Sequence, residues 1–201
     1  MKDVCIVLCS CCGEIMFKGC VHDVDVRASM IFSCTTLLQL VMANNVDEVH
    51  VDATFKVVPS NTGSQFLIIH CMIENYSIPI VYCLMECKTR NTYNCVFNFL
   101  KTHHLANLNP SIVITDYETV LRDTLKFIFP AARITGVGFA TTNYWLRQVG
   151  LNIISINGLP RQNNNSLESF HNTLRNIFNV AHPNLWIFLG NHIYLIFNLF
   201  T

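Results

Sequence analysis

Three long apolar runs in the first half of the chain constrain the fold most strongly. They span residues 49–58, 66–74 and 78–85, and the turn-forming stretches PSNTGS (59–64) and NYS (75–77) separate them. Short apolar runs bounded by Pro, Gly, Asn and Ser are typical of buried strands. Because the spacers are short, the runs predict an antiparallel meander. A chain of 201 residues that is 51% hydrophobic can bury a sizeable core around it.

Strands and helices alternate after the meander. The apolar stretch SIVIT at 111–115 predicts a short strand, and the segments on either side of it have helical periodicity. The other expected elements are helices at 36–43, 92–102, 118–129, 142–149 and 165–180, and a strand at 132–139. A meander extended by strand–helix units predicts an α/β fold, with a central mixed sheet flanked by helices. No internal repeat or long linker is present, so we expect one main domain.

The charge content weighs against one class of function. Only 13% of the residues are charged, and the formal net charge is zero. An independent nucleic-acid-binding domain usually carries a clear excess of Lys and Arg, which this chain lacks as a whole. A local basic groove remains compatible with this composition.

Ten cysteines lie between Cys5 and Cys95, and several fall inside apolar runs, where a free thiol behaves as a small hydrophobic side chain. The first residues do not form a persuasive secretory signal. We therefore expect an intracellular, reducing environment and unpaired thiols. A zinc site built from Cys9, Cys12, Cys20 and His22 is the alternative, but the Cys-x-His spacing of the second pair is unfamiliar, so zinc is not expected.

An apolar segment at 185–200 raises the question of a membrane span. Gly190, Asn191, His192 and Asn198 interrupt it, and it falls short of about 20 clean apolar residues. A core helix is the favoured interpretation, and no membrane association is expected.

Three acidic residues stand out by position. Asp52 interrupts the first apolar run, Asp116 follows the strand SIVIT, and Glu168 lies in the first turn of the helix that begins near residue 165. Carboxylates that converge repel one another unless a divalent cation neutralises them. Two Mg²⁺ or Mn²⁺ ions held by such oxygen ligands support phosphodiester chemistry.

Structural roles explain the same acids. Thr115-x-x-Glu118 matches a capping box, and Asn165-x-x-Glu168 has a related arrangement. Asp52 could accept backbone hydrogen bonds at the edge of the sheet. Spacing alone favours these structural roles over a metal site.

Several motifs occur in an order that matches a known family. They are VHVDATFKVVP, SQFLIIH, IPIVYCLMECKTRNTYNCVFNFL, IVITDYETVL, FPAARITGVGF and NNNSLESFHNTL. Over residues 36–190 the chain resembles the Mutator-like element (MULE) transposase domain, in particular its animal FLYWCH-associated type. The resemblance implies a ribonuclease H-like fold and a DDE core that cuts and joins DNA with two Mg²⁺ or Mn²⁺ ions. It places the metal-binding catalytic triad at Asp52, Asp116 and Glu168.

The resemblance also implies partners and a location. Transposon ends and target DNA are the expected partners, a homo-oligomer is compatible with them, and a functional copy would be nuclear. Lys56, Lys88, Arg122 and Arg147 are candidates for a DNA groove, although scattered cations more often form a solvated surface. His171 shares a helical face with Glu168 and could assist it, but a packed histidine is the commoner case.

The sequence departs from the family at two places. Val137 and Ala140 stand where the family usually has the Cys and His of a Cys-x-x-His motif, and a helical insertion is shortened near 150–162. We therefore expect a truncated or degenerate copy with weakened or lost activity. The alternative is a non-enzymatic domain that binds DNA or protein. The expected division is a poorly defined Cys-rich segment (1–35), the transposase-like domain (36–190) and an apolar tail (191–201).

Overall fold

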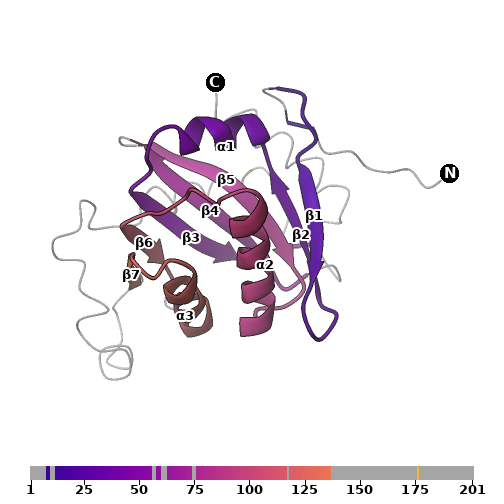
Figure 1. Ribbon diagram of the computed structural model, residues 1–201. Helices are drawn as coiled ribbons and strands as arrows, with labels where there is room; N and C mark the ends of the chain where they lie inside the picture. The colour runs from indigo at the N-terminus through magenta and orange to yellow at the C-terminus, as the bar shows by residue number, and fades with distance from the viewer. Residues whose placement is uncertain are drawn as a thin grey trace.

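A computed structural model describes residues 8–9, 12–55, 58–59, 63–73, 76–116, 118–136 and 176. Within these residues a mixed seven-stranded sheet carries three helices (Figure 1). In chain order the elements are β1 (Phe17–His22), β2 (Ala28–Ser33), α1 (Thr35–Met42), β3 (Glu48–Thr54), β4 (Gln65–Ile73), β5 (Tyr76–Met85), α2 (Arg90–His103), β6 (Ile112–Thr115), α3 (Thr119–Ile128) and β7 (Arg133–Gly136).

The strands are ordered β1-β2-β5-β4-β3-β6-β7 across the sheet. All pairs from β1 to β3 in this order are antiparallel, whereas β6 pairs with β3, and β7 with β6, in parallel. The predicted meander is confirmed as β3, β4 and β5. The predicted strand–helix extension is confirmed as well, with α2 leading into β6 and α3 leading into β7.

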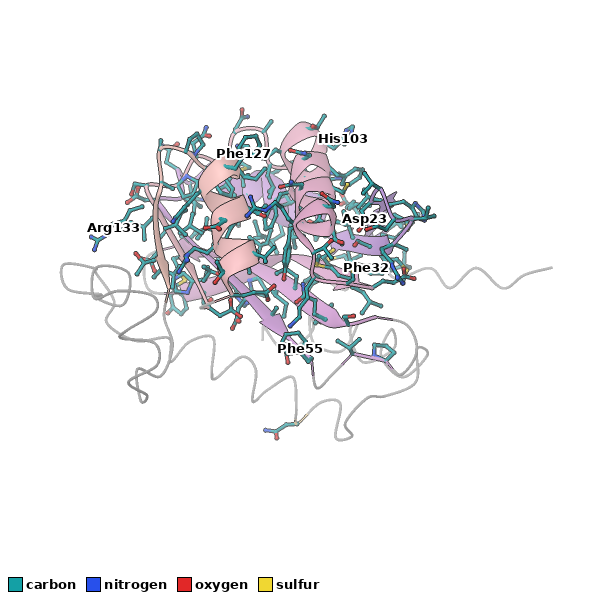
Figure 2. The ribbon with its side chains drawn as sticks, turned by 90° about the horizontal axis from the view of Figure 1, so that it is seen from below. Asp23, Phe32, Phe55, His103, Phe127 and Arg133 are labelled. Atoms are coloured by element: carbon teal, nitrogen blue, oxygen red, sulfur yellow. The ribbon has the colours of Figure 1, made fainter. Side chains whose placement is uncertain are left out.

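The helices α2 and α3 lie side by side on one face of the sheet, as both views show (Figures 1 and 2). Alternate residues of the strands face them, because successive strand side chains point to opposite faces. Val49, Val51 and Ala53 of β3 belong to this core together with Tyr93 of α2 and Leu121 of α3. The amphipathic pattern recognised in the sequence therefore places α2 and α3 correctly.

Two strands form where the sequence has no readable period. The second of them, β2, pairs with β5 and so extends the sheet beyond the meander. The outer strand β1 is an edge strand with mostly exposed or half-buried side chains, and its register shifts between Phe17 and Gly19. Partial burial and this irregularity remove the clean alternation on which a strand prediction depends.

Several element bounds differ from the predictions. The first long strand ends at Thr54 rather than at residue 58, and α3 begins at Thr119 rather than at residue 118. The predicted helix at 142–149 and the apolar segment at 185–200 lie outside the described residues, as does the predicted helix at 165–180 except for Asn176. No helix in the described part of the chain combines the length and apolar character that a bilayer crossing needs.

Candidate functional site

Parallel pairing of β3 with β6 brings Asp52 and Asp116 together. The register opposes Val51 to Thr115, so Asp52, the next residue of β3, comes level with Asp116, which directly follows β6. Both strands run in the same direction, so both acids lie at their carboxyl ends, where open α/β sheets place functional groups. At this position the charge of Asp52 contributes to raising the pKa of Asp116, after the larger effect of burial.

Asp52 occupies an apolar part of the sheet. Its cross-strand neighbour on β4 is Ile68, and alternation places it on the face opposite the core residues Val51 and Ala53. The Ala53 N–H donates to Asp52 Oδ1 over 2.8 Å. Burial nevertheless dominates and raises the pKa of Asp52 to about 6. A carboxyl group with this pKa changes between its neutral and ionised forms around pH 6, well above the range of an ordinary aspartate.

Asp116 is held by the turn that connects β6 to α3. The Glu118 N–H donates to Asp116 Oδ1 over 3.0 Å, a local bond typical of an Asx turn. Burial raises the pKa of Asp116, while the hydrogen bond from Glu118 and the positive charge of Lys88 act in the opposite direction. The backbone therefore orients this side chain, and its environment still resists ionisation.

Glu118 adds a third carboxyl group to this edge. Its Oε1 accepts a hydrogen bond from Tyr93 Oη over 2.9 Å, and Tyr93 Oη in turn accepts one from Gln65 Nε2 over 2.6 Å. Burial raises the pKa of Glu118, and the charge of Asp116 raises it further. We call Asp52, Asp116 and Glu118 the carboxylate cluster.

The predicted capping box at Thr115 and Glu118 is wrong. Glu118 is itself the N-cap residue of α3 and makes no side-chain cap bond, and Thr115 Oγ1 has no hydrogen-bond partner among the described residues. The Glu118 side chain turns to Tyr93 instead. In the sequence, the polar residue Gln65 at the start of the mainly apolar strand β4 indicates that a buried polar partner lies near this position.

One predicted DNA-binding residue lies near the cluster. Lys88 is exposed, and its Nζ lies 5.1 Å from the ring centroid of Phe55, just after β3. Its charge lowers the pKa of both Asp116 and Glu118. Arg122, in contrast, is only 8% exposed, which weighs against contact with a DNA backbone.

Arg133 and the remaining predicted site residues do not lie at the carboxylate cluster in the described part of the chain. Arg133, at the start of β7, projects away from the sheet into solvent (Figure 2). The remaining predicted site residues, Lys56, Arg147, Glu168 and His171, lie outside the described residues.

The carboxylate cluster offers oxygen ligands of the kind that Mg²⁺ and Mn²⁺ prefer. The charge of Asp52 raises the pKa of Asp116, and the charge of Asp116 raises the pKa of Glu118. A divalent cation would offset this effect by favouring the ionised forms. In the described part of the chain, only Cys9, Cys12 and Cys34 place three potential ligand atoms within 4.8 Å of one another. The oxygen atoms of the carboxylate cluster are therefore spaced more widely than these three sulfur atoms.

The cysteines are arranged differently from the zinc alternative considered for the sequence. The eight cysteines in the described residues are all in the thiol form rather than in disulfides, as expected. Cys9 and Cys12 meet Cys34, whereas Cys20 and His22 lie on the edge strand β1. We call Cys9, Cys12 and Cys34 the thiol cluster.

Residues 48–139 match the family model of the MULE transposase domain. The matched segment begins with β3 and contains every strand and helix as far as β7, including the whole carboxylate cluster. The match indicates a transposase-family function for this part of the chain. No curated protein matches the sequence.

Proposed function

We propose that this chain is the catalytic-domain remnant of a MULE-type transposase, of the animal FLYWCH-associated type, with a ribonuclease H-like fold. The strand order supports the fold: an antiparallel meander, β3 to β5, is followed by two strands added in parallel next to β3. This is the arrangement that the resemblance implies. The family match over residues 48–139 supports DNA as the substrate and, for a functional copy, a nuclear location.

Asp52, Asp116 and Glu168 form the proposed triad that holds Mg²⁺ or Mn²⁺. The donor set fits, because Asp52 and Asp116 are carboxylates at one edge whose burial disfavours ionisation without a counter-charge. When bound, the metal ions would supply activation of a water or a 3′-hydroxyl and stabilisation of the leaving oxygen. The backbone bond from Glu118 to Asp116 would keep that ligand in a fixed orientation.

Neighbouring residues would tune this site. The hydrogen bond from Tyr93 lowers the pKa of Glu118, against the larger effect of burial, and so favours the ionised carboxylate that a cation would need. The exposed ammonium group of Lys88 lowers the pKa of Asp116 and of Glu118. The same group could pair with a DNA phosphate.

Activity is proposed to be weakened or lost. Val137 and Ala140 replace the family's Cys and His, and neither side chain can bind a metal ion or donate a comparable hydrogen bond. The shortened insertion near 150–162 removes surface that would position DNA.

The observation that carries the proposal is the placement of Asp52 and Asp116 at the ends of adjacent parallel strands. Calorimetric titration with Mn²⁺ tests it. The wild-type chain should bind the ion, and Asp52→Asn, Asp116→Asn and Glu168→Gln should each weaken binding. Asp25→Asn, at an exposed turn position, is the matched control and should bind as the wild type does. Equal binding by all four variants would contradict the triad.

A strand-cleavage assay addresses activity. A labelled duplex incubated with Mg²⁺ or Mn²⁺ should be cut slowly or not at all, and any cleavage should disappear in Asp52→Asn. Rapid cleavage that depends on Asp52 would overturn the proposed loss of activity. DNA or protein binding without Mn²⁺ binding would favour the non-enzymatic alternative.

A further inference from the structure

The thiol cluster has the dimensions of a metal site. Cys12 Sγ lies 3.5 Å from Cys34 Sγ, and all three sulfur atoms lie within 4.8 Å of one another. A disulfide requires sulfur atoms about 2.05 Å apart, so these thiols are not bonded to each other. Zinc–sulfur bonds of about 2.3 Å in a tetrahedron place sulfur atoms about 3.8 Å apart. The sulfur–sulfur distances in the thiol cluster, 3.5 Å for one pair and at most 4.8 Å for the others, lie around this value.

A tight turn brings Cys9 and Cys12 together. Leu8 and Ile15 form an antiparallel bridge, and Cys9 N–H donates to the Glu14 carbonyl over 2.7 Å. Inside this bridge, Gly13 N–H donates to the Cys9 carbonyl over 2.7 Å, with Gly13 at φ +72°. Glycine suits this left-handed position, which reverses the chain directly after the Cys-x2-Cys pair.

Cys34 comes from a different part of the fold. It follows β2 and is the N-cap residue of α1, where the Leu37 N–H donates to its Sγ over 3.4 Å. The Ser33 N–H donates to the Met16 carbonyl over 2.8 Å and so ties this position to the N-terminal turn. Figure 1 shows the segment before β1 beside the start of α1. The positive end of a helix favours a thiolate at this position, but burial has the larger effect and raises the pKa of the Cys34 thiol, so a bound metal ion would have to displace its proton.

The surroundings of the thiol cluster are suited to a thiolate–metal centre. Cys9 and Cys34 are 1% and 3% exposed, whereas Cys12 is exposed and gives access from solvent. Lys18 Nζ donates to Thr35 Oγ1 over 2.8 Å, so its ammonium group contacts the residue that follows Cys34.

We propose that Cys9, Cys12 and Cys34 bind one zinc ion through three thiolate sulfurs. Thiolates select soft or borderline metals such as zinc and discriminate against Mg²⁺ and Mn²⁺. Three protein ligands leave one tetrahedral position for water or another small ligand. Binding would release thiol protons and would fasten the N-terminal turn to the start of α1. This site is separate from the carboxylate cluster and does not depend on the proposed function.

Titration of the reduced full-length chain with Co²⁺, followed by displacement with Zn²⁺, tests the proposal. We expect one ion per chain, thiolate-to-metal charge-transfer absorption and the intense visible bands of tetrahedral Co²⁺. The charge-transfer band arises only from sulfur ligands, so Co²⁺ bound by the carboxylate cluster would not imitate it.

Matched serine variants locate the site. Cys12→Ser changes an exposed side chain, and Cys34→Ser keeps a good N-cap residue, so both should fold, as circular dichroism would verify. Loss of a residue that only supports a ligand already costs 10- to 100-fold in affinity, so each variant should bind zinc at least about 100-fold more weakly. Cys20→Ser, which removes an exposed thiol on β1, should bind as the wild type does. Absence of the charge-transfer band in the wild type, or equal affinity in all three variants, would overturn the proposal.

Discussion

Substitution of Asp52 by asparagine should stabilise the metal-free protein. Burial raises the pKa of Asp52 from 3.8 to about 6, so the fold favours the protonated form. The stability linked to that proton is fully present below about pH 3.8 and is lost as the pH rises through about 6. At about pH 8 the buried, ionised carboxylate should therefore lower the free energy of unfolding by about 3 kcal/mol. Asparagine carries no charge and avoids this loss.

The pH dependence separates this cause from others. From the same pKa values, the advantage of Asp52→Asn should shrink from about 3 kcal/mol at about pH 8 to about 1.6 kcal/mol at about pH 5. Urea unfolding of both proteins in the presence of a chelator measures the difference at each pH. Asp25→Asn serves as the control, and its stability relative to the wild type should not follow this curve.

Addition of Mn²⁺ should reverse the order of stability. An ion that binds only the folded protein adds about 4.1 kcal/mol at about 1,000 times its Kd, which exceeds the advantage of about 3 kcal/mol, and Asp52→Asn should gain much less from the ion. The reasoning would be refuted if Asp52→Asn were less stable than the wild type by the same amount at both pH values. Asp52 would then be a structural hydrogen-bond acceptor.

Three further substitutions probe the described residues by urea unfolding. Tyr93→Phe removes the hydroxyl that donates to Glu118 and should cost about 1–3 kcal/mol, because buried polar partners are left unsatisfied. Gly19→Ala should cost about 1–3 kcal/mol, since a Cβ at this position would lie 2.9 Å from Phe99 Cζ. Arg122→Met should be neutral or stabilising and should leave DNA affinity unchanged, because the buried Nε and Nη1 of Arg122 have no hydrogen-bond partner among the described residues.

Each substitution has a control. Tyr76→Phe changes an exposed tyrosine and should be silent. Phe99→Leu should rescue Gly19→Ala if the clash is the cause, and failure of that rescue would contradict it. A clear loss of DNA binding in Arg122→Met, with normal stability, would restore this arginine as a DNA contact.

The central strands and helices were predictable because their buried faces produce runs or regular repeats of apolar residues in the sequence. The helix expected at 92–102 is found as Arg90–His103, since its apolar stripe faces the sheet and Thr89 caps its start, with Thr89 Oγ1 accepting from Thr92 N–H. The strands β1 and β2 were not predicted. The edge strand β1 is only partly buried and shows no such pattern, and the inner strand β2 ends in three consecutive buried residues rather than in a clean alternation.

The candidate sites depended on pairings that periodicity does not reveal. The position of Asp116 after a strand was readable, but its registry with Asp52 follows from parallel pairing between distant segments. Glu118 was assigned to a cap because local spacing allowed it, whereas a tyrosine from α2 attracts its side chain. Cys34 was not grouped with Cys9 and Cys12 because the chain must form β1 and β2 before it returns to them.

The position of β2 has a practical consequence for the solubility of shortened chains. It covers the edge of β5, a strand of ten residues whose last seven are buried. A protein that began at residue 36 would leave that edge with unpaired N–H and carbonyl groups beside an apolar surface. Long apolar edges of this kind recruit strands from other molecules. Expression of the transposase-like region without residues 17–33 should therefore yield aggregates, even though every residue matched by the family model is retained.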